Sequence, residues 1–297
     1  MHTGAKSDSS EETGESSPGA TPNSSTAKQE WLEIVPGQIW TRYYFLRFAG
    51  TTIVARTTVI KLTNGNLMIH SPGGALDDET KAEIQAFGGE VAYLIAPGTY
   101  HFLNIPEWQK AYQKSETYLC PGLEKKRPEL THTGLLREEP EEGWRDDFEQ
   151  TIIVGRVISE VLFLHKPSKT LIVTDLLEFC TDDFSKEFAG EASWVSWFWV
   201  KLFQMQNRPV MAPEYRTMGF PNKAEVKAKM TKIVEDWKAE RVIIAHGENV
   251  TQGARNVELI LRHCWAPILG KTAPTLAPDL VEAENEQENS ETAEASK

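Results

Sequence analysis

The sequence predicts an α/β (α+β layered) fold in which helices cover two packed β-sheets. Three features carry this prediction: an antiparallel opening, a middle of alternating strands and helices, and a hairpin followed by a closing strand–helix pair. The glycine-rich loops of nucleotide-binding proteins and the Gly-x-Ser-x-Gly turn of serine hydrolases do not occur in the sequence. The commonest nucleotide-binding and serine-hydrolase functions are therefore not expected.

The first third of the chain is rich in β-branched and aromatic residues, which favour strands. Asn64-Gly65 lies between two apolar runs and suits the positive φ angles of a tight hairpin turn. We therefore expect an antiparallel sheet here. The predicted strands are residues 31–35, 38–48, 51–62 and 67–69.

After Gly74 the pattern changes to alternating helices and strands. Asp77 and Asp78 predict a helix start, because their carboxylates complement the positive N-terminus of a helix that ends near Phe87. Residues 124–149 are charged and contain prolines, so we expect a surface excursion there. The other predicted elements are a strand over 91–95, a helix over 106–113 and a strand over 117–119.

The second half repeats this arrangement. Asn222 followed by Glu225 predicts the start of an amphipathic helix, and Thr251 is expected to cap the last helix. His165 opens the turn of a hairpin, and we expect it to be exposed to solvent. The predicted strands are residues 152–154, 160–164, 171–174 and 242–245, and a further helix is predicted over 183–203.

The two ends of the chain differ from the rest in composition. Residues 1–29 and 271–297 hold few large apolar side chains, so we expect them to be disordered tails on a domain of residues 30–270. Of the net charge of −12, −2 lies in residues 1–29, −5 in residues 271–297 and −5 in the mildly acidic core, and no basic stripe is visible. Nucleic acid is therefore not an expected partner.

Cysteine content and hydropathy indicate the compartment. The three cysteines are far apart, which argues against a disulfide framework and fits small buried side chains in a reducing environment. The N-terminus lacks a secretory signal pattern, and no apolar run reaches the ~18–20 residues of a membrane span. We expect a cytoplasmic protein, with the nucleus as the alternative.

Three candidate metal ligands follow three predicted buried strands. His101, Asp175 and His246 each stand just beyond the carboxyl end of a strand, where layered α/β folds bind their ligands. Two imidazoles and one carboxylate that converge can hold a divalent ion such as zinc or iron. Singly, each of these residues more often has a structural role, so the alternative is that no metal binds.

These segments resemble the metallo-β-lactamase-fold hydrolases. Residues 93–106 look like the stretch that carries the His-x-His-x-Asp-His motif, the hairpin 161–174 before Asp175 resembles the hairpin that ends in the metal-bridging Asp, and His246-Gly247 looks like the closing strand's His-Gly. The resemblance spans about residues 31–265. More narrowly, the chain is similar to a group of uncharacterised domains of this fold. The resemblance implies a metallo-β-lactamase-like αββα sandwich.

The chain departs from the motif of that family at several ligand positions. If His101 is the last residue of the motif, Ala96 and Gly98 replace its first two histidines and Tyr100 replaces its Asp. The histidine expected before the hairpin falls near Gly155, where none exists. By this alignment one metal position has lost all three histidines. The other keeps His101, Asp175 and His246, so the resemblance implies a single-metal site.

Several other residues have candidate roles near this site. Tyr100 is a candidate hydrogen-bond partner for substrate, and His70 stands where the family carries an Asp that supports the metal ligands. Trp194, Trp197 and Trp199 belong to a dense aromatic stretch, which either covers the core or forms an exposed patch for a protein partner.

Two functions remain open from the sequence. The first is a mononuclear-metal hydrolase of a small ester, thioester or phosphoester, a chemistry that only the resemblance implies. The second is a metal-free pseudoenzyme that serves as a binding or scaffold module. Fold alone does not decide between them, because function depends on the site.

Overall fold

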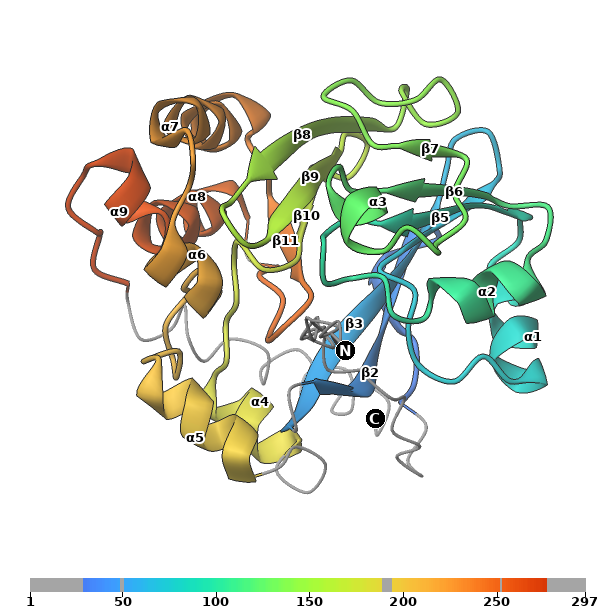
Figure 1. The fold of residues 1–297 in the computed structure, drawn as a ribbon, viewed down its shortest axis with the longest axis horizontal. Helices are drawn as coiled ribbons and strands as arrows, with labels where there is room; N and C mark the ends of the chain where they lie inside the picture. Colours follow the sequence, from blue (N-terminus) through green and yellow to red (C-terminus); the bar gives the residue numbers. More distant parts are fainter. Residues whose placement is uncertain (1–28, 49–50, 189–193, 252, 277–297) are drawn as a thin grey trace, which may run out of the picture.

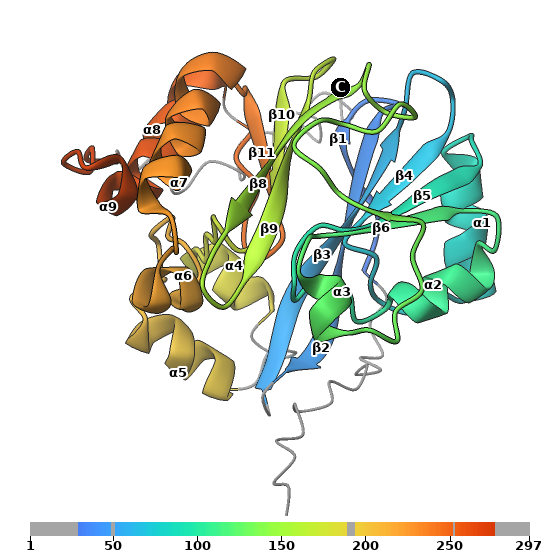
Figure 2. The same cartoon turned by 45° about the horizontal axis from the view of Figure 1, so that its top comes forward.

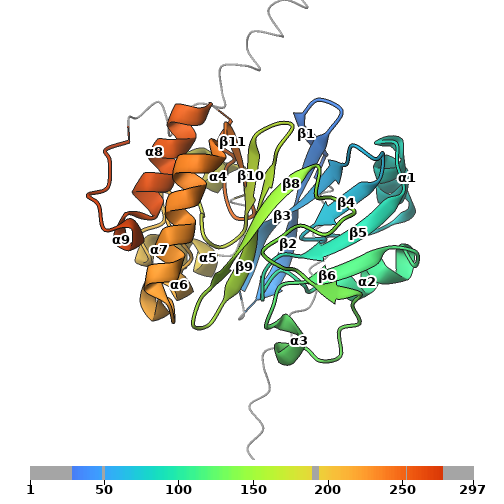
Figure 3. The same ribbon diagram turned by 90° about the horizontal axis from the view of Figure 1, so that it is seen from above.

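Two β-sheets pack face to face, and helices cover both outer faces. The structure is a computed structural model that describes residues 29–48, 51–188, 194–251 and 253–276. Figure 1 shows the elements along the chain, and Figure 2 shows the two sheets facing each other. Seen from above in Figure 3, α7 and α8 cover one outer face and α1 and α2 the other. The predicted αββα sandwich is confirmed.

The first sheet has seven strands in the order β1-β2-β3-β4-β5-β6-β7. Its pairs are antiparallel from β1 to β4 and parallel from β4 to β7. The predicted hairpin at Asn64-Gly65 joins β3 to β4, but only Gly65 of the pair has positive φ (86°). The strands are β1 (Leu32–Val35), β2 (Ile39–Phe48), β3 (Thr51–Lys61), β4 (Leu67–His70), β5 (Val91–Ala96), β6 (Glu116–Leu119) and β7 (Gly134–Leu135).

The second sheet has four strands in the order β11-β10-β9-β8. Strands β8, β9 and β10 form antiparallel pairs, whereas β10 and β11 are parallel. The strands are β8 (Phe148–Val154), β9 (Ser159–His165), β10 (Thr170–Val173) and β11 (Arg241–Ile244).

The helices follow local signals in the sequence. Asp77 caps α1 by accepting a hydrogen bond from the Thr80 amide at 2.7 Å, and Asn222 caps α7 in the same way. The apolar side chains of α7 and of the π-helical turn after it are buried, as their spacing predicts. The helices are α1 (Asp78–Ala86), α2 (Ile105–Ala111), α3 (Leu123–Lys126), α4 (Asp182–Glu187), α5 (Trp194–Leu202), α6 (Pro213–Met218), α7 (Lys223–Lys232), η1 (Ile233–Trp237), α8 (Ala254–Cys264) and α9 (Ala266–Leu269).

Three layers of apolar side chains hold these elements together. Ile95 and Phe163 lie in the core cluster shared by the two sheets. Trp108 of α2 packs in a second cluster on the outer face of the first sheet, and Met230 of α7 packs with Leu171 on the outer face of the second. All three cysteines are buried and free, as predicted. None of the helices in the described residues is long and apolar enough to span a membrane.

Some sequence-based predictions of local structure are wrong. The segment predicted as a surface excursion contains Trp144, which is 1% exposed and donates a hydrogen bond from its indole to Gln150 at 3.0 Å. His165 is buried rather than exposed, because its Nδ1 pairs with the Ser168 hydroxyl at 2.7 Å. Thr251 does not cap α8, whose N-cap is Gly253.

The single helix predicted over 183–203 is two helices, α4 and α5, and residues 189–193 between them lie outside the described part of the chain. The segments 1–28 and 277–297 lie outside it as well, so the disordered tails and the limits of the 30–270 domain stay predictions.

Candidate metal centre

The three predicted ligands come together at one edge of the sandwich. His101 follows β5, Asp175 follows β10 and His246 follows β11, and one ligand atom from each lies within 4.8 Å of the others. The parallel pairing of β10 with β11 aligns Val173 with Ile244, so the loops after them start side by side. Strand pairing therefore brings Asp175 and His246 together, and the packing of the two sheets brings His101, from the first sheet, to the same point.

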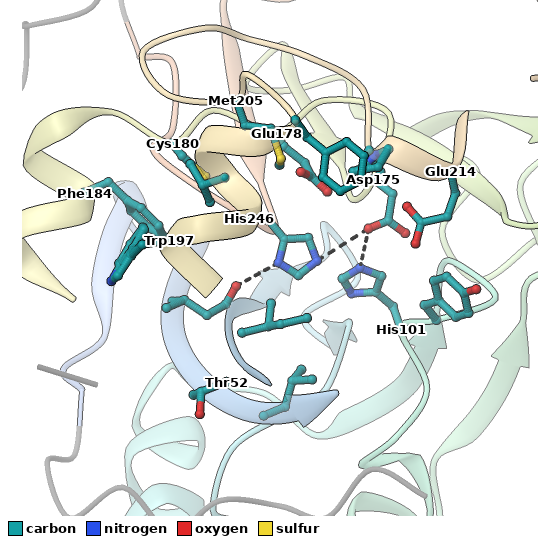
Figure 4. Close-up of a pocket in the computed structure, with 18 of the residues that line it drawn as sticks. Thr52, His101, Asp175, Glu178, Cys180, Phe184, Trp197, Met205, Glu214 and His246 are labelled. Atoms are coloured by element: carbon teal, nitrogen blue, oxygen red, sulfur yellow. Dashed lines mark hydrogen bonds and ion pairs between the residues drawn. The ribbon is translucent and has the colours of Figure 1, made fainter. Parts of the chain in front are cut away.

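The distances within this group suit a metal better than a direct hydrogen bond. Asp175 Oδ1 lies 3.4 Å from His101 Nε2 and 3.5 Å from His246 Nε2 (Figure 4). Ligand atoms ~2.0–2.2 Å from a zinc ion in a tetrahedral arrangement are about 3.3–3.6 Å apart. A good charged N–H···O hydrogen bond is shorter, about 2.7–2.9 Å. Two of the three separations therefore match those around a tetrahedral divalent ion, and the two histidine atoms lie within 4.8 Å of each other.

The other ring nitrogens of both histidines are held by the protein. His101 Nδ1 is hydrogen-bonded to the Ser71 hydroxyl, and His246 Nδ1 to the carbonyl oxygen of Val54, both at 2.8 Å. A carbonyl only accepts, so the Nδ1 of His246 carries a proton, and in the neutral ring Nε2 keeps its lone pair. Metal-binding histidines are commonly oriented in this way. The structure thus directs both Nε2 atoms toward Asp175.

The ionised carboxylate of Asp175 is paired with positive charge on the neighbouring histidines. Burial acts to raise the pKa of Asp175, but His101 and His246 outweigh it and hold that pKa well below its ordinary value. Burial alone would lower the pKa of His246, yet Asp175 and then Glu178 outweigh it and raise this pKa to about 9. Without a metal, a proton on His246 supplies the positive charge. A divalent ion would have to displace it.

A buried carboxylate that the sequence analysis overlooked positions Asp175. Glu160 of β9 is fully buried and accepts hydrogen bonds from the amides of Thr174, Asp175 and Leu176 at 3.1, 2.7 and 3.0 Å, and from the Thr174 hydroxyl. In the sequence, the indication of this role is a single Glu at the start of an otherwise apolar hairpin, because a buried carboxylate needs hydrogen-bond partners. Glu160 therefore fixes the loop that carries Asp175.

A second buried side chain positions the loop of His246. Arg56 of β3 donates a hydrogen bond to the carbonyl of Gly247 at 2.7 Å. Gly247 has φ of 123°, and a Cβ added there would lie 2.2 Å from the carbonyl oxygen of Phe179. No other residue fits this position without a shift of the backbone, so the glycine after His246 is a structural requirement.

His70 does not make the supporting contact expected beside the ligands. It is buried, its ring meets that of Phe163 edge-on, and its Nε2 has no hydrogen-bond partner in the described residues. Burial lowers the pKa of His70 to about 3. The next residue, Ser71, reaches His101 because its backbone adopts a φ of 52°. A role for His70 at the site stays a prediction.

A cavity of about 520 Å³ opens beside the three ligands. Tyr100 lines it, and the ammonium of Lys126 lies 3.8 Å from the centre of the Tyr100 ring. Two carboxylates, Glu178 and Glu214, line it as well. Neither could be predicted from the sequence, because they come from an irregular segment and a short helix that no periodic pattern predicts.

The comparisons with known proteins agree with this fold. No curated protein matches the chain. Among solved structures, the DIM-1 metallo-β-lactamase is 15% identical, with a TM-score of 0.53 over 80% of this chain and 94% of that one. A metallo-β-lactamase from Hirschia baltica is 12% identical, with a TM-score of 0.51 over 84% of this chain and 100% of that one.

The metallo-β-lactamase FIM-1 from Pseudomonas aeruginosa, in a mono-zinc form, is 9% identical, with a TM-score of 0.51 over 79% of this chain and 93% of that one. The chain therefore has the metallo-β-lactamase-like fold that its resemblance implies. A family model described as a domain of unknown function, DUF4336, matches residues 36–186, which is half of the chain. The protein belongs to the DUF4336 family.

Proposed function

We propose that the protein is a hydrolase that uses one divalent metal ion, held by His101, Asp175 and His246. The observation that carries this proposal is the separation of 3.4 and 3.5 Å between the two Nε2 atoms and Asp175 Oδ1, in a group whose other ring nitrogens are already engaged. FIM-1, a neighbour in fold, has a mono-zinc form, which supports one metal as sufficient for this architecture.

The proposed reaction is the hydrolysis of an ester, thioester or phosphoester. When bound, the ion would act as a Lewis acid and make water more acidic. Glu214 lines the pocket, and its pKa is raised by burial and by Asp175, as suits a group that accepts a proton from water. Burial raises the pKa of Tyr100, so its phenol stays protonated and can donate a hydrogen bond to substrate.

The test combines elemental analysis with turnover. We expect about one equivalent of zinc or iron per chain in the purified full-length protein, and loss of that metal in His101→Ala and His246→Ala. His132→Ala is the matched control, because His132 is exposed, lies outside the cavity lining and is hydrogen-bonded to the carbonyl of Leu130.

Hydrolysis of p-nitrophenyl butyrate, of a butyryl thioester and of p-nitrophenyl phosphate is measured on the same samples. Turnover that follows the metal would support the proposal. Full turnover in His246→Ala, or no metal in the wild type after reconstitution, would refute it.

A second candidate function is a metal-free binding module. The observation in its favour is an exposed apolar row on α5, formed by Trp194, Phe198 and Leu202, which are 78%, 52% and 53% exposed. Residues four apart share one helix face, so this row forms a continuous patch. Trp197 instead lines the pocket, and the side chain of Trp199 lies outside the described part of the structure.

If this second function is correct, chelation leaves the unfolding midpoint unchanged and no metal copurifies. Trp194→Ser should then abolish partner binding, while His246→Ala leaves it intact.

A further inference from the structure

The cavity beside the metal centre is lined mainly by apolar side chains. Its volume of about 520 Å³ falls within the ~300–1,000 Å³ range of small-molecule sites. Strands β2 and β3, helices α4 and α5 and the segment after α5 form its apolar wall. The apolar side chains of this wall include Leu46, Val54, Phe184, Trp197, Val200 and Phe203.

Helix α5 covers the cavity with one of its faces. Trp197 and Val200 line the cavity and pack against the cluster that contains Phe184, whereas Leu202 is exposed on the outside. The inner face of α5 is thus apolar where it meets the cavity. An apolar ligand would remove this wall from water, and burial of apolar surface is the main favourable term in binding such ligands.

The charged groups of the cavity are all at one end. Figure 4 shows Phe184 and Trp197 on one side of the pocket, and His101, Asp175 and Glu214 on the other. The described lining includes the carboxylates of Asp175, Glu178 and Glu214 but no lysine or arginine. His246, which carries a proton in the metal-free protein, already pairs with Asp175 at 3.5 Å, so a phosphate or carboxylate on the ligand would meet no unpaired cation in the described lining.

We infer that the cavity binds the acyl chain of an uncharged ester, with the chain along the apolar wall and the ester group beside His101 and His246. The reaction rests on the proposed hydrolase function, whereas the binding of the chain does not. Hydrolysis would add water across the acyl–oxygen bond and release an alcohol and a carboxylic acid.

Binding is tested on the full-length protein after removal of metal by chelation. An uncharged, solvent-sensitive naphthalene dye occupies the cavity and is displaced by methyl esters with acyl chains of increasing length. We expect the dissociation constant to fall about threefold to fourfold for each added methylene until the chain fills the cavity. An alkyl phosphate of equal chain length should bind at least tenfold more weakly.

Two neighbouring residues provide matched variants. Phe203→Asp places a charge in the cavity wall, and we expect it to weaken binding of the longest ester at least tenfold. Leu202→Asp, one residue earlier on the exposed face of α5, should leave binding unchanged. If Phe203→Asp fails to fold, as judged by circular dichroism, the chain-length series on the wild type still tests whether the cavity binds an acyl chain.

Equal affinity for short and long esters, or equal affinity for the alkyl phosphate, would overturn the inference. Because neither metal nor turnover enters this assay, its outcome is independent of the metal proposal. A metal-loaded enzyme that hydrolyses short esters with no preference for chain length would overturn the acyl site and leave the hydrolase proposal standing.

Discussion

Replacement of Glu160 by Gln tests whether this buried carboxylate holds the ligand loop. One oxygen, Oε2, accepts from Thr174 and Asp175, while Oε1 accepts from the Leu176 amide at 3.0 Å. In Glu160→Gln the amide carbonyl can replace Oε2, but the NH₂ group then faces the Leu176 N–H, so two donors meet in a buried site.

The expected loss follows from these contacts. Bonds to a charged acceptor contribute about 1.5–3 kcal/mol each and bonds to a neutral one about 0.5–1.5 kcal/mol, and an unsatisfied buried donor costs about 1–3 kcal/mol. Burial and Asp175 raise the pKa of Glu160 well above its ordinary value against the three amide donors, so the loss comes mainly from the two donors that meet, and we expect a net destabilisation of about 1–3 kcal/mol. Thr174→Val removes only the hydroxyl bond and should cost about 1 kcal/mol.

The assay is urea unfolding of the metal-free proteins, with the slope of the transition compared between variants to confirm that the unfolded states match. Zinc affinity of each variant is measured alongside, because a displaced Asp175 should bind metal more weakly. A loss of less than about 0.5 kcal/mol in Glu160→Gln, which is the ordinary range for surface substitutions, would refute the reasoning. Unchanged zinc affinity would refute the positioning role.

Further predictions concern the same centre. The pKa of His246 is about 9 in the folded protein and about 6.5 in the unfolded chain. The contribution of protonated His246 to stability is therefore complete below pH 6.5 and is lost as the pH rises through 9. The free energy of unfolding of the metal-free protein in urea should therefore fall by up to ~3 kcal/mol over this window, and His246→Asn should remove the part due to His246 while the part due to Glu178, whose pKa burial raises to about 8, remains. Zinc affinity should rise with pH over the same window, since zinc must displace the proton; isothermal titration at pH 7 and 9 checks the sign. Ser71→Ala removes the hydrogen bond to His101 and should weaken zinc binding about 10–100-fold in that assay. Gly247→Ala should destabilise the fold in thermal unfolding, because its Cβ would overlap the carbonyl of Phe179.

The sequence predicts the elements with clear periodicity and the residues that follow them. Strand patterns place β3, β5, β10 and β11 within a few residues of their observed limits, and the ends of β5, β10 and β11 lead to the three candidate ligands. Strand ends in this architecture converge for topological reasons, so candidates such as His101 and Asp175 can be found from pattern and spacing alone.

Residues whose position depends on tertiary packing could not be predicted. Trp144 is buried although its sequence neighbours are charged, because its indole donates a hydrogen bond to Gln150 and packs in the core between the sheets. Ser71 reaches His101 through a left-handed backbone conformation that its residue type does not favour. Glu178 is brought to the pocket by a bridge between its backbone and that of Val210, a long-range contact with no local signal.

Two residues stand where the resemblance expects histidines of a second metal position, and the structure shows their surroundings. Ala96 and Gly98 stand where the resemblance expects histidines, and Ala96 is completely buried in the core. Gly98 forms a β-bridge with Glu160, and a Cβ on Gly98 would already contact the Thr174 hydroxyl oxygen at 3.4 Å and the Glu160 Cβ at 3.6 Å. A side chain larger than Ala at Gly98 would extend from a Cβ that already touches Thr174 and Glu160, and the hydrogen bonds between these two residues hold the loop of Asp175.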